Sequence, residues 1–405
     1  MRLVVTCNGP GETAGWLRPL LRAVYALHPN AEVHVFYVPD DYATGAEPRI
    51  ARELFPQAHV YDPKTYLRVA LGAKVAGMPE SAGCVLYLGG DLLHAARLHR
   101  RFGGALATYK FSRPRYAAQT QRAYAVDEKN AQQLAQWRMA PDRVQIVGNL
   151  AIDGAFAQAE SPPDPGTPHD GILFMPGSRR QEVRQLVPFF FTAALAIARE
   201  APHLPVAFGI APFTGLSDVR EALEAGADPR FFARRGMLVE RAGETFAASQ
   251  DGRVLFPIVR SALASARCAR LTVTIPGTKV IELAALGVPV ISCTPANAPE
   301  LAAINGPLTY LDRIPLVGAA AKRTIVMAYS RRHRFHTQPN IDAGRSIVYE
   351  LHGTLTPGRV ARVALDRFAD GAWLAESAQA LAGLYREHVG AANRMARSLL
   401  ELAGR

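Results

Sequence analysis

Short runs of apolar residues alternate along this chain with segments whose apolar residues recur every three to four positions. In the first 90 residues these runs predict strands at Leu3–Cys7, Val33–Val38, His59–Tyr61 and Val85–Leu88. Between them, helical spacing predicts helices at Leu17–Leu27 and Pro48–Phe55. Strands separated by helices of this length are typical of right-handed βαβ crossovers, so we expect a parallel sheet.

The alternation restarts after a proline-rich segment. Residues Ser161–Asp170 contain four prolines, and because neither a helix nor a central strand accommodates them we interpret the segment as a linker. Beyond it, further strands are predicted at Ile172–Met175, Val206–Ile210, Met237–Glu240, Leu271–Thr274 and Val290–Ser292. Helical patterns follow at Glu182–Arg199, Pro357–Phe368 and Ala375–Leu402. The first of these helices is apolar on all sides over Leu186–Ala198, which favours a core helix over a lipid groove.

Two sets of alternating strands and helices predict an α/β fold of two doubly wound, Rossmann-like domains facing each other across a ligand-binding cleft. The first domain would cover residues 1–165 and be completed by a C-terminal helix from about 375 to 405. The second would cover residues 166–374.

Composition narrows the class of protein without identifying it. With 49% apolar and 20% charged residues among 405, a mostly disordered chain is excluded. The four cysteines lie far apart, so we expect neither disulfides nor a thiolate metal site. Such cysteine usage favours a reducing compartment.

The sequence also gives expectations about location and partners. No signal peptide or spanning helix is evident, which favours a cytoplasmic location. The net charge of +11 suits phosphates or anionic lipid. Because no nucleic-acid-binding module is evident, we expect no nucleic-acid partner. The oligomeric state is not indicated.

The first glycine turn, Gly9–Gly15, follows a predicted strand and opens a helix. It is similar to a dinucleotide-binding turn, and an NAD-dependent dehydrogenase is an alternative hypothesis that depends on this turn alone. Gly11, in this turn, is a candidate for binding the substrate or nucleotide. Glu12, at a helix start, is a candidate to bind a sugar hydroxyl or to act as a base. A tight turn that only needs small residues is the simpler interpretation.

The second glycine turn, at Gly177, joins a strand to a long helix. The free N–H groups of that helix start, with the Ser178 hydroxyl and the Arg179 guanidinium, predict an anion site. Ser178 with Gln181 or Glu182 also fits a helix-capping arrangement, which does not explain the Arg179-Arg180 pair.

The third glycine turn, at Gly277, has the same form. The backbone N–H groups of Thr278 and Lys279 are candidates to bind a diphosphate. Glu282, one turn into the helix, is placed to accept two ribose hydroxyls. A solvent-facing glutamate is the alternative.

Four sequence blocks occur in the order found in one known family. They are Val147–Asp153, Pro176–Val183 with its PGSR turn, Gly277–Pro289 and Gln338–Leu351. Together they resemble the lipid-A-disaccharide synthase family of nucleotide-sugar glycosyltransferases, which have the GT-B architecture. The first 110 residues depart more from that family; Trp16, for example, stands where the family carries an acid.

The resemblance implies an inverting, metal-independent glycosyltransferase. It would move an acylated glucosamine from a UDP donor to a lipid-linked glucosamine acceptor, with the UDP-sugar as substrate and no cofactor. Glu182 in the second block, and Asn340 and Arg345 in the fourth, join the donor-side candidates. Asp91 stands where the family has a catalytic aspartate and is the candidate base, although it also makes a good helix N-cap. The alternatives are a UDP-sugar transferase with another lipid or glycan acceptor, and a non-catalytic relative that binds a UDP-sugar or lipid.

An anionic membrane surface is a further candidate partner. The basic segment Lys322–His336 would contact phosphate or anionic lipid, or else be a solvated helix face. Apolar residues near the first turn would add to that surface, namely Trp16, Leu17, Leu20 and Leu21. The spacing His333-x-x-His336 lies in this arginine-rich stretch, so we expect no metal there.

Overall fold

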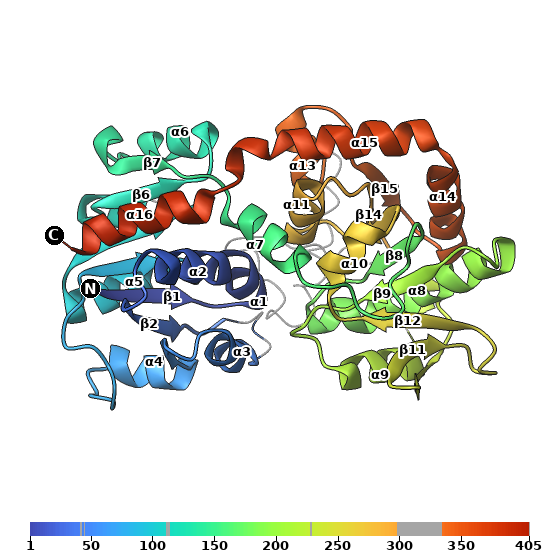
Figure 1. Cartoon of the computed structure of the whole chain (residues 1–405), viewed down its shortest axis with the longest axis horizontal. Coiled ribbons are helices and arrows are strands. Elements are labelled where there is room, and N and C mark those ends of the chain that lie inside the picture. The colour runs from blue at the N-terminus through green and yellow to red at the C-terminus, as the bar shows by residue number, and fades with distance from the viewer. Residues whose placement is uncertain (41–42, 44, 111–113, 227–228, 298–333, 405) are drawn as a thin grey trace. The chain divides into compact units, whose positions relative to one another are not determined.

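The computed structural model describes residues 1–404 except 41–42, 44, 111–113, 227–228 and 298–333. The chain divides into two compact units (Figure 1). The first consists of Met1–Ala157 and Glu387–Arg405, and the second of Gln158–Arg386.

The first unit is built on a seven-stranded parallel sheet in the order β3-β2-β1-β4-β5-β6-β7. Its strands are β1 (Arg2–Cys7), β2 (Glu32–Tyr37), β3 (His59–Tyr61), β4 (Cys84–Tyr87), β5 (Ala105–Tyr109), β6 (Arg122–Ala125) and β7 (Val144–Ile146). The central strand β1 is buried from Leu3 to Cys7, as expected for a strand covered on both faces.

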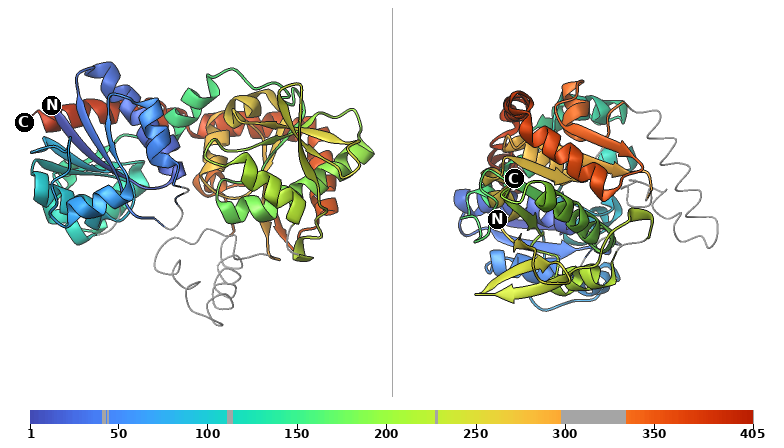
Figure 2. Two further views of the ribbon diagram at one scale, coloured as in Figure 1. Left: turned by 90° about the horizontal axis from the view of Figure 1, so that it is seen from below. Right: turned by 90° about the vertical axis from the view of Figure 1, so that its right-hand side faces the viewer.

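Helices cover both faces of this sheet (Figure 2). Val5 and Val35 pack in one apolar cluster with helices α2 (Arg18–Leu27) and α16 (Ala391–Ala403). Val4 and Phe36 point to the other face, where they pack with α4 (Pro63–Ala70) and α5 (Leu92–Phe102). The remaining helices of the unit are α1 (Pro10–Glu12), which continues into a π-helical turn at Thr13–Leu17, α3 (Glu47–Leu54), α6 (Glu128–Gln136) and α7 (Leu150–Ala159).

The second unit contains an eight-stranded sheet in the order β10-β11-β12-β9-β8-β13-β14-β15. The strands are β8 (Ile172–Met175), β9 (Val206–Gly209), β10 (Met237–Arg241), β11 (Glu244–Ala248), β12 (Leu255–Val259), β13 (Leu271–Thr274), β14 (Val290–Pro295) and β15 (Tyr349–Gly353). From β12 to β15 all neighbours are parallel, whereas β10, β11 and β12 pair antiparallel.

The long helix α8 (Arg180–Glu200) lies in the core of this unit. Phe189, Phe190 and Phe191 are fully buried among β8, β9 and their neighbours, which confirms the core helix favoured by the sequence. The other α-helices among the described residues of this unit are α9 (Leu216–Ala225), α10 (Ala262–Cys268), α11 (Thr278–Ala285), α13 (Gln338–Ala343), α14 (Pro357–Ala369) and α15 (Gly371–Leu384).

The predicted α/β class with two Rossmann-like domains of the GT-B type is confirmed. One predicted helix was wrong. The single helix expected over Ala375–Leu402 is observed as two helices, because the chain turns between Tyr385 and Gly390. Of these, α15 belongs to the second unit and α16 to the first. In the described parts of the chain, no helix is both long and apolar enough to cross a membrane.

Candidate functional site

The two glycine turns at 177 and 277 lie at the ends of neighbouring strands. β8 and β13 pair in parallel, with Met175 opposite Thr274. The Thr274 hydroxyl donates a 2.8 Å hydrogen bond to the main-chain oxygen of Met175. Gly177 and Gly277 follow within three residues, so both turns emerge at the carboxyl edge of the sheet side by side.

These turns also flank a topological switch point of the second sheet. From β8 the chain passes through α8 to β9, whereas from β13 it passes through α11 to β14, on the opposite side of the sheet order. Because such crossovers are right-handed, α8 and α11 cover opposite faces. In open α/β sheets, the crevice that binds ligands lies where the strand order reverses in this way.

The turn before α8 is capped by a side chain of its own helix. Gly177 has a φ of 100°, and a Cβ atom there would overlap Glu182. The buried Glu182 carboxylate accepts hydrogen bonds from the backbone N–H groups of Ser178 and Arg179, each at 3.1 Å. The N–H groups that we expected to bind an anion are therefore already hydrogen-bonded to a carboxylate. These contacts favour a capping role for Glu182 over nucleotide binding.

The arginines of this turn also have acidic neighbours. The Arg179 guanidinium lies 3.4 Å from the Glu182 carboxylate. Arg180 is largely exposed and lies 3.4 Å from Asp218 and 3.7 Å from Glu221. These pairs account for the two cations at a helix start, which capping alone did not explain.

The turn before α11 is open. Gly277 has φ 155° and ψ −173°, a backbone conformation that only glycine adopts readily. No side chain within the described ranges caps this helix start, so the N–H groups of Thr278 and Lys279 keep their attraction for an anion. Of the two predicted anion turns, this one has the geometry to bind a diphosphate.

One charged pair accompanies the open turn. The Lys279 ammonium lies 2.8 Å from a Glu282 carboxylate oxygen. Glu282 is only 4% exposed, which contradicts the alternative of a solvent-facing glutamate, while the Lys279 side chain is partly exposed. The pair lies at the start of α11, where the Lys279 charge is balanced by Glu282.

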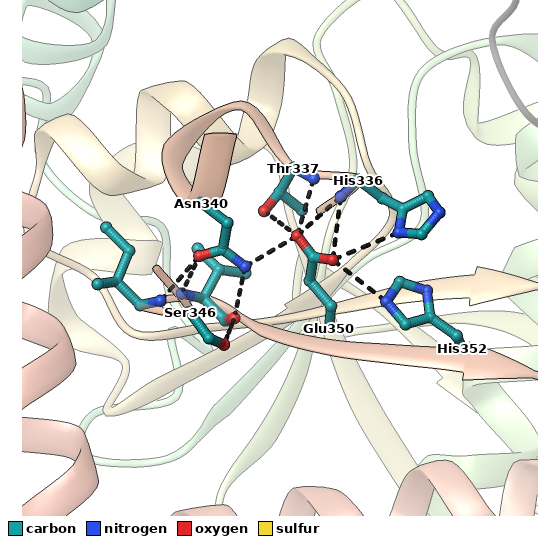
Figure 3. Close-up of polar contacts among 8 residues, drawn as sticks. His336, Thr337, Asn340, Ser346, Glu350 and His352 are labelled. Atoms are coloured by element: carbon teal, nitrogen blue, oxygen red, sulfur yellow. Dashed lines mark hydrogen bonds and ion pairs between the residues drawn. The ribbon is translucent and has the colours of Figure 1, made fainter. Parts of the chain in front are cut away.

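The two candidates in the fourth sequence block have different surroundings. Asn340 is fully buried, and its amide oxygen accepts from the N–H groups of Ile347 and Val348, both at 2.8 Å. Its amide nitrogen donates to the Val348 oxygen and to Glu350 (Figure 3). These contacts favour a role in holding the loop before β15 over the direct nucleotide contact that we expected. Arg345 is exposed and lies 3.4 Å from Glu376.

Glu350 is the centre of this cluster and was not among the predicted site residues. Its buried carboxylate accepts from the backbone N–H groups of His336 and Thr337, the Thr337 hydroxyl, the Asn340 amide and His352 Nε2. Burial alone would raise the pKa of Glu350, but the hydrogen bonds from His352, Thr337 and His336 outweigh it and hold the pKa at about 2.

The first unit has a similar switch point between β1 and β4, where the strand order also reverses. Glu12 follows β1, and a Cβ atom at Gly89, after β4, would overlap Asn8 and lie 3.2 Å from Cγ of Glu12. The turns after β1 and β4 are thus in contact. Gly11 is exposed, with open space around its Cα.

Asp91 begins α5 as its N-cap. Its carboxylate accepts a 2.8 Å hydrogen bond from the backbone N–H of Leu93, which confirms the capping role. The residue is exposed, so a carboxylate oxygen also faces solvent at this edge. Its catalytic role stays a prediction.

Two polar residues beside Glu12 were not among the predicted site residues. Asn8 donates a 3.0 Å hydrogen bond from its amide to Asp40. A Cβ atom at Gly9 would lie 2.9 Å from a Glu12 oxygen and 3.3 Å from an Asp40 oxygen, so both carboxylates flank that glycine. The signal was available, because Asn8 and Asp40 each come shortly after a buried strand.

The prediction that apolar residues near the first turn contribute to a membrane-binding surface was wrong. Leu17, Leu20 and Leu21 are fully buried under the first sheet, and Trp16 packs edge-on against Tyr109 with 5.4 Å between ring centroids. Their apolar character serves the core of the first unit. The basic residues from Lys322 to His333 lie outside the described residues.

Comparisons with known proteins found a partial relative in sequence and solved structures of similar fold. No protein-family model matches the chain. It is 28% identical over 236 residues to the lipid-A-disaccharide synthase of Myxococcus xanthus, a match that covers 57% of this chain and 49% of that protein. The chain thus spans about half the length of this relative.

Similar solved structures cover nearly the whole chain. The UDP-GlcNAc 2-epimerase of Neisseria meningitidis, bound to UDP-GlcNAc, is 12% identical with a TM-score of 0.54, covering 99% of this chain and 100% of that one. The UDP-GlcNAc 2-epimerase of Methanocaldococcus jannaschii, in complex with UDP-GlcNAc and UDP, is 14% identical with a TM-score of 0.55 and the same coverage.

Proposed function

We propose that this protein is a glycosyltransferase that uses a UDP-sugar. The observation that carries the proposal is the uncapped start of α11 at a topological switch point, with Gly277 in a glycine-specific conformation and Lys279 beside it. A diphosphate would accept hydrogen bonds from the first-turn N–H groups and be stabilised by the positive end of the helix. Two solved structures of similar fold contain bound UDP-GlcNAc, which supports UDP as the nucleotide.

The sugar and acceptor follow from the sequence blocks. Because these resemble lipid-A-disaccharide synthase, we propose an acylated glucosamine as the transferred sugar and a lipid-linked glucosamine as the acceptor. Such an acylated substrate would bring the protein to an anionic membrane surface from the cytoplasm. Another lipid or glycan acceptor remains compatible with the same UDP site.

The proposed reaction is an inverting, metal-independent displacement at the anomeric carbon. A base removes the proton from the acceptor hydroxyl, and its oxygen forms a bond to the anomeric carbon while the bond from that carbon to the diphosphate oxygen breaks. We assign the base to Asp91, with Glu12 as the second carboxylate of that edge. The N-terminus of α11 and Lys279 would stabilise the negative charge on the departing UDP, where Arg179 is a further candidate.

A UDP-sugar 2-epimerase is the second candidate, because similar solved structures carry that name. The two functions differ in product. A transferase releases UDP only when an acceptor is present and forms a new glycosidic bond. An epimerase converts UDP-GlcNAc into its C2 epimer without any acceptor.

One set of assays distinguishes them. The purified protein is titrated with UDP and with NADH by calorimetry, then incubated with UDP-2,3-diacylglucosamine and acylated glucosamine 1-phosphate, and separately with UDP-GlcNAc alone. We expect UDP binding, no NADH binding, and an acylated disaccharide by mass spectrometry. A C2 epimer from UDP-GlcNAc alone would instead establish the epimerase, and UDP binding without either product would indicate a non-catalytic relative.

A further inference from the structure

Two imidazoles converge on one carboxylate oxygen of Glu350 in β15. Glu350 Oε2 lies 3.1 Å from His352 Nε2 and 3.5 Å from His336 Nδ1 (Figure 3). The two histidine rings are 4.3 Å apart between centroids. Glu350 and His336 are nearly buried, with side-chain exposures of 7% and 11%, and His352 is 38% exposed.

The spacing of these atoms is that of ligands around one metal ion. All three residues can offer a ligand atom within 4.8 Å of the others. In a tetrahedral zinc site, with bonds of about 2.0–2.2 Å, neighbouring ligand atoms lie roughly 3.3–3.6 Å apart. The carboxylate-to-imidazole distances of 3.1 and 3.5 Å are close to that value, so an ion would need only small side-chain shifts.

The carboxylate is already oriented for such a role. Its other oxygen, Oε1, accepts from the Thr337 hydroxyl and the Asn340 amide at 2.6 and 2.8 Å. Hydrogen bonds of this kind fix a ligating carboxylate and direct its second oxygen, here Oε2, at the ion. The Nδ1 atom of His352 is buried with no hydrogen-bond partner among the described residues, so its imidazole is not fully satisfied within the protein.

The neighbouring strand adds two polar groups on the same face of the sheet. Ser292 lies opposite Glu350 in the β14–β15 register, and Thr294 lies opposite His352. In the part of the chain that the structure describes, neither buried hydroxyl has a hydrogen-bond partner. A water molecule in the fourth coordination position would be a suitable partner for such hydroxyls.

We propose that His336, Glu350 and His352 bind one divalent transition-metal ion, with Zn²⁺ the best match. Two imidazoles and one carboxylate are ligands that Zn²⁺ prefers, and three protein ligands leave one position open. The ion would join β15 to the segment that leads into α13, and it is independent of the proposed sugar transfer. Our expectation of no metal considered histidines close in sequence, whereas these ligands span residues 336 to 352.

The test uses the full chain without an affinity tag, after dialysis against a chelator. Zn²⁺ is titrated in competition with a chromophoric chelator, and Co²⁺ is titrated while visible absorption is recorded, since a tetrahedral Co²⁺ site absorbs strongly. The variants are His336→Gln and His352→Gln. His203→Gln changes an exposed histidine of the same unit and is the matched control.

We expect one equivalent of Zn²⁺ to bind with micromolar or tighter affinity, and each ligand variant to weaken it by about tenfold or more. The control variant should bind like the parent. Absence of stoichiometric binding of both ions to the parent would overturn the proposal, and so would equal affinity in the parent and both ligand variants. The Co²⁺ spectrum of the parent shows whether the protein has a tetrahedral metal site even if a variant fails to fold. Loss of UDP binding, by contrast, would bear only on the proposed function.

Discussion

The hydroxyl of Thr274, the last residue of β13, is bonded to the main-chain oxygen of Met175, the last residue of β8. This bond ties together the ends of the two strands from which the turns at Gly177 and Gly277 depart. The sheet itself therefore fixes the distance between the two turns. Only the second turn is left open to a ligand, because Glu182 caps the first.

Replacing Thr274 with valine should destabilise the protein. The substitution keeps the shape of the side chain but leaves the buried Met175 oxygen without its donor, a loss of about 1–2 kcal/mol in the free energy of unfolding. Thr272→Val is a matched control, because Thr272 lies on the same strand and is buried, while its hydroxyl has no partner within the described residues. Urea unfolding of both variants measures the difference. Equal stability of the two would show that the bond contributes nothing.

Gly277→Ala should weaken UDP binding. A Cβ atom is strained at φ 155° and ψ −173°, so the turn must move and its N–H groups lose their alignment. We expect a loss of affinity of about tenfold or more, corresponding to about 1.4 kcal/mol. Gly358→Ala, in α14 where no atom obstructs a Cβ, should bind UDP like the parent. Calorimetric titration compares them, and unchanged affinity in Gly277→Ala would remove the α11 turn from the UDP site.

Asp91→Asn separates the two roles of that residue. Asparagine is as good an N-cap as aspartate, so the fold and UDP binding should be preserved. An amide cannot act as a general base, and we expect the rate of sugar transfer to fall by about 100-fold or more. Steady-state rates and UDP affinity are measured on the same preparation. A variant that transfers at the parental rate would leave Glu12 as the candidate base.

The sequence predicted the elements whose signal is local. Buried strands such as Ile172–Met175 and Leu271–Thr274 were found with their observed bounds, because each is a short apolar run ended by a glycine turn. Strands β5, β6, β7, β11, β12 and β15 were missed. Several of them contain polar or small residues such as Thr108 and Glu350, whose burial depends on partners distant in the chain.

The same distinction holds at the candidate site. Gly277 was identified from its own neighbours in sequence, and its backbone conformation requires glycine. The capping of the other turn by Glu182 was one of two open interpretations, since the sequence does not show where a carboxylate points. The Glu350 cluster could not be predicted from the sequence. Its histidines, His336 and His352, are brought together by the loop before β15, which Asn340 holds in place.

Asp153→Ala should release the C-terminal helix of the first unit. The Asp153 carboxylate accepts from the backbone N–H groups of Gly390 and Ala392, at 2.8 and 2.6 Å, where α16 begins. Without it these N–H groups lose their acceptor, at a cost of about 2–3 kcal/mol. Hydrogen exchange in α16 should accelerate relative to β1. Asp142→Ala, at an exposed aspartate of the same unit, is the control, and parental exchange in Asp153→Ala would contradict this anchoring role.

Glu350 should make stability depend on pH in the acidic range. Its pKa is lowered to about 2 in the folded protein from an ordinary 4.5, so the folded state favours the charged carboxylate. The resulting stabilisation is fully present above about pH 4.5 and is lost as the pH falls toward 2, and a shift of this size corresponds to about 3 kcal/mol. In the presence of a chelator, Glu350→Gln should be less stable than the parent by about this amount at pH 7, and the difference should shrink below pH 4.5.

The control is Glu376→Gln, at an exposed carboxylate of the same unit. It should follow the parent at every pH, because an exposed ion pair contributes little. If the difference in the free energy of unfolding between parent and Glu350→Gln stays constant from pH 7 to pH 3, the charge on Glu350 does not stabilise the folded protein.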